Sequence, residues 1–190
     1  MDRIRIRKVE LLSDDWARLE KATFDYRRAD GRWQTQVRQI NDRGDGAAIL
    51  PHDRSRNTVL LVRQFRYPAF ANGHEGHLIE ACAGLLDADD PETCIRREAE
   101  EELGYRIGQV ELVFAPFMSP GSLTERLWCF TGAYSAADRI SNGGGQEAEG
   151  EDIEVLEMPL DDAFAACRDG RIVDAKTILL IQHLKLRGDA

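Results

Sequence analysis

Three runs of alternating apolar and polar residues open the chain. They are Ile4 to Leu12, Ala17 to Tyr26 and Trp33 to Ile40. A period of two residues is typical of β-strands with one solvated face. The pattern therefore predicts an N-terminal antiparallel β-meander over residues 1–42, which precedes a main domain over residues 43–190.

The main domain mixes short apolar runs with amphipathic helical segments. The predicted strands are Ala47 to Leu50, Thr58 to Phe65, His77 to Cys82, Val110 to Ala115, Arg126 to Tyr134 and Ile153 to Met158. The first two are expected to pair as a hairpin, and the third is expected to end where Ala83-Gly84 interrupts it. The predicted helices are Pro91 to Leu103, Leu160 to Arg168 and Ala175 to Leu186. This order predicts an α/β fold, with a mixed β-sheet sandwiched between helices on both faces.

The helix that begins at Pro91 has the clearest end signals in the chain. Asp90 is a good N-cap, Pro91 suits the first helical position, and Gly104 suits the residue after the last turn. The apolar stripe on this helix is formed by Ile95, Ala99 and Leu103. We therefore expect a well-anchored helix whose apolar face packs on the sheet.

Two carboxylates, Glu98 and Glu102, lie one turn apart on the flank of that stripe. Arg97 with Glu101 and Arg96 with Glu100 are expected i,i+4 ion pairs, but they leave Glu98 and Glu102 as neighbouring like charges. Such a pair is unfavourable, and more so where water is excluded. A divalent cation would remove the conflict, whereas an ordinary solvated acidic face is the simpler reading of four acidic residues.

Composition and charge narrow the function. The chain has 190 residues, of which 43% are hydrophobic, so it has enough apolar material for one domain with a small extension. The formal net charge of -9 argues against general binding to nucleic acid or to an anionic membrane. An anionic substrate is therefore expected to be held by a metal or by a few placed cations.

The start of the chain, its apolar runs and its cysteines indicate the cellular compartment to expect. The start of the chain lacks the apolar core of a signal peptide, and no run approaches the roughly 18 apolar residues that span a bilayer. The cysteines Cys82, Cys94, Cys129 and Cys167 are scattered and predict neither a zinc site nor a disulfide framework. We expect a soluble cytoplasmic protein with reduced, mostly buried thiols.

The acidic helix carries a specific family pattern. The stretch Arg97-Glu98-Ala99-Glu100-Glu101-Glu102-Leu103-Gly104-Tyr105 matches the R-E-U-x-E-E-x-G-U half of the Nudix box, and Gly84 resembles its opening glycine. The loop between them is one residue short, so the first glutamate of the pattern falls on Asp90 or on Asp89. The chain thus resembles the Nudix hydrolases, which implies the Nudix fold for residues 43–190.

The resemblance extends beyond the box. Arg63-Gln64-Phe65-Arg66-Tyr67-Pro68 and the downstream Pro120 resemble the ADP-ribose and nucleotide-sugar pyrophosphatase branch. The segments similar to the GDP-mannose pyrophosphatases are Asp42-Arg43-Gly44, Ile79-Glu80-Ala81-Cys82-Ala83-Gly84, Met118-Ser119-Pro120-Gly121, Gly143-Gly144-Gly145 and Asp174-Ala175-Lys176-Thr177. The implied reaction is hydrolysis of GDP-mannose to GMP and mannose 1-phosphate. The alternatives are ADP-ribose, giving AMP and ribose 5-phosphate, and a catalytically silent Nudix-fold binding module.

The same resemblance implies a metal site and a catalytic loop. The carbonyl of Ala83 and the carboxylates of Glu98 and Glu102 are expected to hold Mg2+, for which Mn2+ is a possible substitute. Glu101 is expected to support this site or a second metal, and Arg97 to orient the glutamates. Glu149 is the expected base and Glu151 an additional metal ligand. The loop is about two residues longer than in the GDP-mannose type, so Glu147 competes for either role.

Substrate contacts and a partner are implied as well. The implied contacts are Trp16, Arg38, Arg66, Ala83, Gly84, Leu85, Glu125 and Lys176. Guanidinium groups bind phosphate in a bidentate manner, which suits Arg38 and Arg66, although each such residue alone is as readily an ordinary surface or packing residue. Relatives in this branch exchange their N-terminal segments. The resemblance therefore implies a homodimer that binds a nucleotide sugar and neither nucleic acid nor membrane.

Overall fold

The computed structural model describes residues 3–188, except for the side chain of Glu149, and the chain divides into two units. The smaller unit comprises Met1–Asp45 and Phe117–Arg126, and the larger comprises Gly46–Pro116 and Leu127–Ala190. Each unit has its own sheet.

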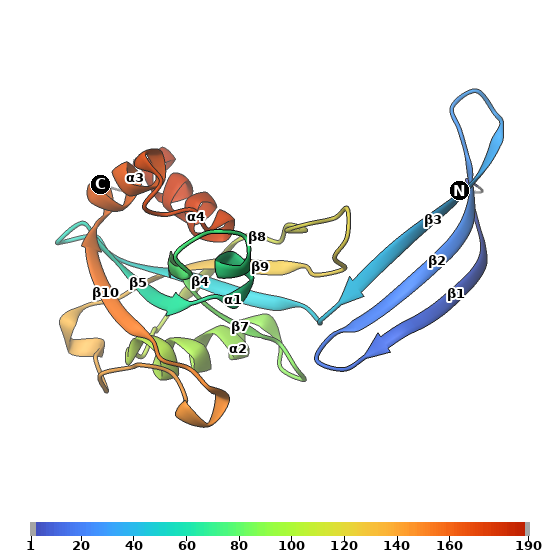
Figure 1. The fold of residues 1–190 in the computed structure, drawn as a ribbon. Coiled ribbons are helices and arrows are strands. Elements are labelled where there is room, and N and C mark those ends of the chain that lie inside the picture. The colour runs from blue at the N-terminus through green and yellow to red at the C-terminus, as the bar shows by residue number, and fades with distance from the viewer. Residues whose placement is uncertain (1–2, 189–190) are drawn as a thin grey trace. The chain divides into compact units, whose positions relative to one another are not determined.

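The smaller unit contains the predicted meander, which is drawn in blue in Figure 1. Its strands β1 (Ile4–Asp14), β2 (Arg18–Arg27) and β3 (Trp33–Asp42) pair antiparallel in that order. Hydrogen bonds attach the 117–126 segment to the end of β3. Asn41 N–H donates to the Ser122 carbonyl at 2.9 Å, Thr124 N–H donates to the Asn41 carbonyl at 3.2 Å, and the Thr124 hydroxyl donates to Asp42 at 2.9 Å. The sequence pattern did not predict this return of the chain.

The larger unit is built on a mixed seven-stranded sheet. Its strands are β4 (Gly46–Asp53), β5 (Thr58–Phe65), β6 (His77–Glu80), β7 (Cys82–Leu85), β8 (Val110–Phe114), β9 (Leu127–Ala133) and β10 (Glu154–Pro159). The main order is β10-β5-β4-β9-β8, with β6 beside β5 and β7 beside β4. Only the β4–β9 pair among these ladders is parallel within the described residues. The predicted mixed sheet is therefore confirmed.

The expected hairpin and the third expected strand differ from the structure. Strands β4 and β5 pair only at His52–Val59 and Asp53–Thr58, because beyond the turn β4 continues against β7 while β5 continues against β6. The segment predicted as one strand is thus two, and the chain changes partners at Ala81. The Ala81 N–H donates to the Thr177 hydroxyl at 2.6 Å, which satisfies it at the switch.

Helices cover both faces of this sheet, as predicted. The helix α2 (Pro91–Glu98) and its π-helical continuation η1 (Ala99–Leu103) lie on one face, and α3 (Leu160–Asp169) and α4 (Ala175–Leu186) lie on the other (Figure 1). A short helix α1 (Tyr67–Ala71) was not predicted. None of the helices in residues 3–188 combines the length and the apolar character needed to cross a bilayer.

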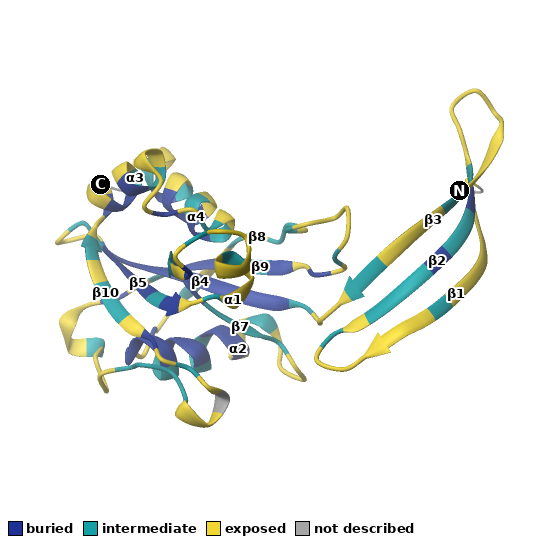
Figure 2. Cartoon of the chain, in the orientation of Figure 1, coloured by how far each residue is buried: buried dark blue, intermediate teal, exposed yellow. Residues whose placement is uncertain are grey.

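The core lies between the sheet and these helices. Strand β4 is buried along its whole length, and most of β5 is buried as well (Figure 2). On the α2 face, Ile95, Ala99 and Leu103 are fully buried in the main cluster, so the predicted apolar stripe is confirmed. The burial of this stripe brings the acidic flank of the helix close to the sheet.

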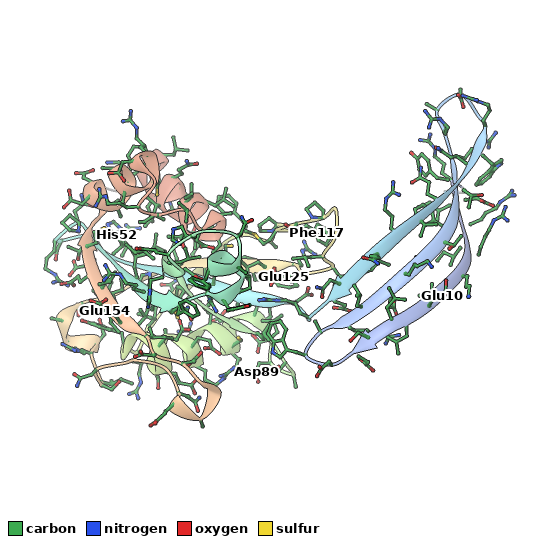
Figure 3. All side chains as sticks on the ribbon, in the orientation of Figure 1. Glu10, His52, Asp89, Phe117, Glu125 and Glu154 are labelled. Carbon is green, nitrogen blue, oxygen red and sulfur yellow. The ribbon has the colours of Figure 1, made fainter. Side chains whose placement is uncertain are left out.

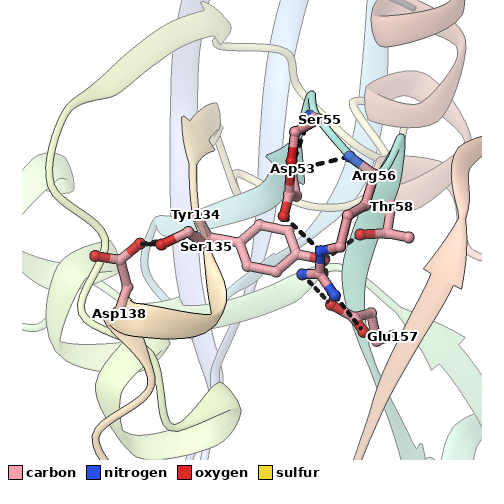
Figure 4. A network of polar contacts seen from close by, with 8 residues as sticks. All are labelled: Asp53, Ser55, Arg56, Thr58, Tyr134, Ser135, Asp138 and Glu157. Carbon is pink, nitrogen blue, oxygen red and sulfur yellow. Dashed lines mark hydrogen bonds and ion pairs between the residues drawn. The ribbon is translucent and has the colours of Figure 1, made fainter.

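A polar network fixes the far end of the sheet (Figure 4). Arg56 binds Glu157 of β10 at 2.6 and 3.0 Å and Asp53 at 2.6 Å, while the Tyr134 hydroxyl donates to Glu157 at 2.8 Å. Hydrogen bonds from Ser55 and Arg56 hold the pKa of Asp53 well below its usual range. The β4–β5 turn is therefore tied both to β10 and to the residue that follows β9.

Candidate active site

The acidic helix begins as its sequence predicts and ends in a wider turn. The Asp90 carboxylate accepts hydrogen bonds from the N–H groups of Glu92 and Thr93, each at 3.1 Å, and Gly104 ends the helix with a φ of 76°. From Ala99 to Leu103 the helix is π-helical, a geometry that is rare and often found at functional sites. This turn carries Glu100, Glu101 and Glu102.

Both flanking carboxylates meet the backbone of β7. A Cβ atom added to Gly84 would lie 2.3 Å from the carboxylate carbon of Glu98, so only glycine leaves room for that side chain. The Ala83 N–H donates to Oε2 of Glu102 at 3.2 Å. Glu98 is 9% exposed and Glu102 is 1% exposed. The structure thus brings Ala83, Gly84, Glu98 and Glu102 together at one buried point, followed along β7 by Leu85.

Charge and burial perturb the inner carboxylate. Burial raises the pKa of Glu102 to about 7, and the nearby charges of Glu98 and Glu151 act in the same direction. Hydrogen bonds from the Cys82 thiol and the Ala83 N–H oppose part of this rise. Glu102 is therefore a carboxylate whose charged form is poorly stabilised by the protein alone.

Arg97 organises the acidic residues around the outer carboxylate. Its Nη1 atom lies 2.9 Å from Oε1 of Glu98 and 3.2 Å from Oε2 of Glu101, and its Nε atom lies 3.5 Å from Asp89, labelled in Figure 3. The expected Arg97–Glu101 pair is present. Asp90 caps the helix and Asp89 contacts Arg97, so each candidate for the first glutamate of the motif has a contact of its own.

The prediction of an ion pair between Arg96 and Glu100 is wrong. Arg96 binds Glu92 at 2.7 Å and donates to the carbonyls of Ile107 and Gly108, whereas Glu100 pairs with Arg106 at 2.9 Å. The i,i+4 rule assumes α-helical spacing. The Arg97–Glu101 pair keeps this spacing, whereas Arg96 is occupied by Glu92 and two carbonyls and Glu100 is occupied by Arg106.

The glycine-rich acidic loop is fastened to the end of this helix. The N–H groups of Gly144 and Gly145 donate to the carbonyls of Glu102 and Glu101, at 2.9 and 3.2 Å. Gly145 has a φ of 77°, and an added Cβ would lie 2.4 Å from Oε2 of Glu151, which accepts a hydrogen bond from the Gln146 N–H at 2.8 Å. Glu151 is thereby held close to Glu102.

The two remaining loop glutamates lie in a short 3-10 turn, Glu147–Glu149. The side chain of Glu147 is exposed. The side chain of Glu149, the expected base, lies outside the described part of the structure. The assignment of Glu149 as the base, with Glu147 as the alternative, therefore stays a prediction.

Two of the expected substrate-binding cations, Arg66 and Lys176, are neighbours. Arg66, just after β5, binds Glu80 through Nε and Nη2 at 2.9 and 3.0 Å, and Lys176 of α4 binds Glu80 at 2.5 Å and Asp174 at 3.1 Å. Glu80 was not among the predicted site residues. The sequence did contain a signal for Glu80, because it follows the apolar residues Leu78 and Ile79 of a predicted strand. A carboxylate that is buried with such a strand requires a cationic partner.

Three other expected substrate contacts lie in the smaller unit. Trp16 is 75% exposed and the Arg43 guanidinium lies 5.6 Å from its ring centre, while the same guanidinium lies 3.0 Å from the buried Glu125. Arg38 instead donates to the Val37 carbonyl and to Gln36. Arg43, which links Trp16 to Glu125, was missed as a site residue although the Asp42-Arg43-Gly44 segment had been singled out.

The donors at β7 fit a small hard cation. Among the described side chains, which exclude that of Glu149, no three from His, Cys, Asp or Glu gather in a metal-binding arrangement. Two carboxylates beside a strand backbone are nevertheless an appropriate set for Mg2+, which prefers oxygen ligands and keeps several waters or substrate oxygens. The absence of a Cβ at position 84 and the raised pKa of Glu102 agree with a cation there.

Comparisons with known proteins match both parts of the chain. Residues 3–40 match the family model of the GDP-mannose pyrophosphatase NudK N-terminal domain, and residues 42–181 match that of the NUDIX domain. The chain is 53% identical to a GDP-mannose pyrophosphatase of Pectobacterium atrosepticum, covering 97% of this chain and 95% of that relative. It is 48% identical to one of Cronobacter sakazakii, covering 97% and 96% respectively.

A solved structure supports the architecture. The crystal structure of an ADP compounds hydrolase superposes with a TM-score of 0.75 and covers 100% of this chain and 98% of its own. The sequence identity is 16%, so this likeness bears on the fold.

Proposed function

The chain belongs to the Nudix hydrolase family and is a pyrophosphatase that acts on nucleotide sugars, and from that premise we propose that its substrate is GDP-mannose, cleaved to GMP and mannose 1-phosphate. Relatives about half identical over nearly the whole chain carry that name. The observation that carries the proposal is the meeting of Glu98 and Glu102 with the β7 backbone, beside the cations Arg66 and Lys176.

We assign the metal site to the Ala83 carbonyl, Glu98 and Glu102, with Mg2+ as the ion and Mn2+ as a substitute. Bound Mg2+ would neutralise charge on the phosphate oxygens and lower the pKa of water. Arg97 holds Glu98 and Glu101 in place by the contacts described above. Glu101 and Glu151 lie at the edge of the site and would support the same ion or a second one.

The side chains around this site have separate roles in the proposed hydrolysis. Arg66 and Lys176 bind the pyrophosphate, whose anionic oxygens otherwise repel a nucleophile. A water oxygen attacks one phosphorus, the bond from that phosphorus to the bridging oxygen breaks, and the second phosphate leaves with the bridging oxygen. Glu149 takes the proton from the attacking water. Its place in a loop attached to the acidic helix supports this role.

We propose that each unit offers its own candidate contacts for the nucleotide sugar. Trp16, Arg38 and Glu125 are the candidate contacts from the smaller unit, and Ala83, Gly84 and Leu85 those from the β7 backbone of the larger unit. The exposed ring of Trp16 and the exposed guanidinium of Arg38 are available for this purpose.

We propose that the smaller unit also forms a homodimer. Strand β1 leaves Ile4, Ile6 and Leu11 more than half exposed, and an uncovered three-stranded sheet has little stability of its own. A second copy of the chain would cover this surface. Light scattering after size exclusion is expected to give about twice the 21.4 kDa chain mass.

We also propose a cytoplasmic location, which fits the four free cysteines, of which three are buried.

Product identification tests the proposed reaction. With GDP-mannose and Mg2+, the expected products are GMP and mannose 1-phosphate, and an excess of chelator should abolish their release. GDP and free mannose would instead indicate cleavage of the sugar–phosphate bond and would overturn the assignment. Release of the expected products in the presence of chelator would overturn the metal site.

A further inference from the structure

The buried carboxylate of Glu80 stands between the two proposed phosphate-binding cations. Its side chain is only 3% exposed. Oε1 and Oε2 accept hydrogen bonds from Arg66, and Oε2 also accepts one from Lys176. Burial alone would raise the pKa of Glu80, but these two cations outweigh it and the pKa lies below its usual value. Glu80 is therefore charged and forms the centre of the cluster.

The contacts leave part of each cation unused. Arg66 binds Glu80 through one edge of its planar guanidinium, with Nε and Nη2. Lys176 donates a hydrogen bond to Glu80 and forms an ion pair with Asp174. Among the described residues, Nη1 of Arg66 has no partner, and Lys176 keeps an N–H group beyond these two contacts. The Arg66 side chain is 41% exposed, so its free edge is accessible.

The cluster is also fixed against the carboxylate site. Asp174 caps α4 by accepting a hydrogen bond from the Thr177 N–H, and the Thr177 hydroxyl binds the Ala81 N–H directly after Glu80. The charge of Glu102 is close enough to raise the pKa of Arg66. The two cations are thus held beside Glu102 by the strand switch at Ala81 and by the start of α4.

We propose that Glu80 is a positioning residue for phosphate binding, which fixes Arg66 and Lys176 at one point and leaves their remaining N–H groups for adjacent phosphates of a nucleoside diphosphate. This inference rests on the proposed function, because it assumes that these cations meet a pyrophosphate. A carboxylate that only neutralised the cations would compete with phosphate. The geometry favours positioning, since each cation binds Glu80 and retains donors for a second anion.

The test compares Glu80→Gln with Glu154→Gln. Glu154 pairs with Arg63 at 2.8 Å on the neighbouring strand and is exposed (Figure 3), so it controls for the loss of one ion pair. For Glu80→Gln we expect the KM for GDP-mannose and the Kd for GDP, measured by calorimetry, to rise about tenfold or more. The kcat should stay within about threefold. Glu154→Gln should match the wild type in all three values.

A purely structural role would give a different result, namely a lower melting temperature and a reduced kcat from a smaller folded fraction, with unchanged KM and Kd. That result would overturn the proposal. Tighter binding of GDP by Glu80→Gln would also overturn it, because Glu80 would then compete with phosphate.

A second variant covers the risk that an uncompensated cation prevents folding. Glu80→Asp keeps the charge but is one methylene shorter and cannot reach both cations, so the Kd for GDP should rise at least about threefold. An unchanged Kd would overturn the proposal. If the wild type binds GDP but does not cleave GDP-mannose, the proposed function fails while the GDP comparison still decides the role of Glu80. If the wild type cleaves GDP-mannose without measurable binding of GDP, the comparison of KM values decides the role of Glu80, and absence of both cleavage and GDP binding would overturn both proposals.

Discussion

Two carboxylates placed together against a strand backbone are the central feature at the scale of single residues. Glu98 and Glu102 are both nearly excluded from water, and the pKa of Glu102 is raised to about 7 by burial and by its acidic neighbours. A buried like-charge pair destabilises a fold unless something neutralises it. Arg97 offsets part of the charge of Glu98, and a bound divalent cation would neutralise the rest. The proposed chemistry requires the same cation.

Replacing Glu102 should therefore remove activity without removing the fold. Glu102→Gln is expected to lower turnover of GDP-mannose by about 10²-fold or more, because an amide is a poor ligand for Mg2+. Glu100→Gln, on the same turn but paired with Arg106, is the matched control and should retain near-normal turnover. Steady-state rates over a range of Mg2+ concentrations measure both. Near-normal rates for Glu102→Gln would remove it from the site.

The raised pKa of Glu102 predicts a dependence of stability on pH in the metal-free protein. Folding favours the neutral carboxyl, so its contribution is fully present below about pH 4.5 and is lost as the pH rises through about 7. The loss amounts to about 3 kcal/mol. In chelator, the melting temperature of Glu102→Gln relative to the wild type should therefore increase by several degrees from pH 5 to pH 8.

If the melting temperatures of the two proteins changed equally between pH 5 and pH 8, that result would contradict the raised pKa of Glu102. Addition of Mg2+ at pH 8 should raise the melting temperature of the wild type more than that of Glu102→Gln, since a ligand stabilises the state that binds it.

At the scale of elements, the sequence predicted those helices and strands whose limits depend on neighbouring residues alone. The caps Asp90 and Gly104 and the apolar stripe predicted the acidic helix, because these signals lie within the helix itself. The π turn over Ala99–Leu103 was not predictable, since a run of acidic residues has no period that distinguishes it. The switch from β6 to β7 depends on a hydrogen bond from Ala81 to Thr177, 96 residues away, and such a contact leaves no local pattern.

The short helix α1 was missed for a related reason. Its five residues, Tyr67–Ala71, include no buried side chain and are too few to establish a helical period.

The packing of β7 against the helix gives a prediction for Gly84. Gly84→Ala should weaken Mg2+ binding and lower stability by about 1–3 kcal/mol, because the new methyl group occupies the space of the Glu98 carboxylate. Gly108→Ala is the control, since an added Cβ there meets nothing within 4 Å. Calorimetric titration with Mg2+ and thermal melting measure the two effects. Equal behaviour of the two variants would show that Glu98 does not need this space.

The acidic loop allows a test of the base. Glu149→Gln should lower kcat for GDP-mannose more than it raises KM, because the proton transfer is lost while phosphate binding is kept. Glu147→Gln is the comparison within the same 3-10 turn. A larger loss of kcat for Glu147→Gln would transfer the role of base to that residue.

At the scale of the whole molecule, the site of the larger unit collects residues from distant parts of the chain. Arg66 follows β5, Ala83 and Gly84 lie in β7, Glu98 and Glu102 lie on the acidic helix, and Lys176 lies in the first turn of α4. The Nudix pattern and its neighbouring segments singled out these residues as candidates, and their roles stay predictions. The same patterns did not predict the partners that hold them, Glu80 for the cations and Arg43 for Trp16, because only the folded chain brings such partners together.

The net charge of -9 makes this local arrangement of cations necessary for an anionic substrate.

The most direct test of the account is a comparison of kcat/KM for GDP-mannose and ADP-ribose with Mg2+, with the products of each identified. We expect a strong preference for GDP-mannose and release of GMP with mannose 1-phosphate. A preference for ADP-ribose would keep the chemistry at Glu98 and Glu102 but contradict the proposed substrate. Hydrolysis of neither compound would contradict the proposed function and favour a role in binding alone.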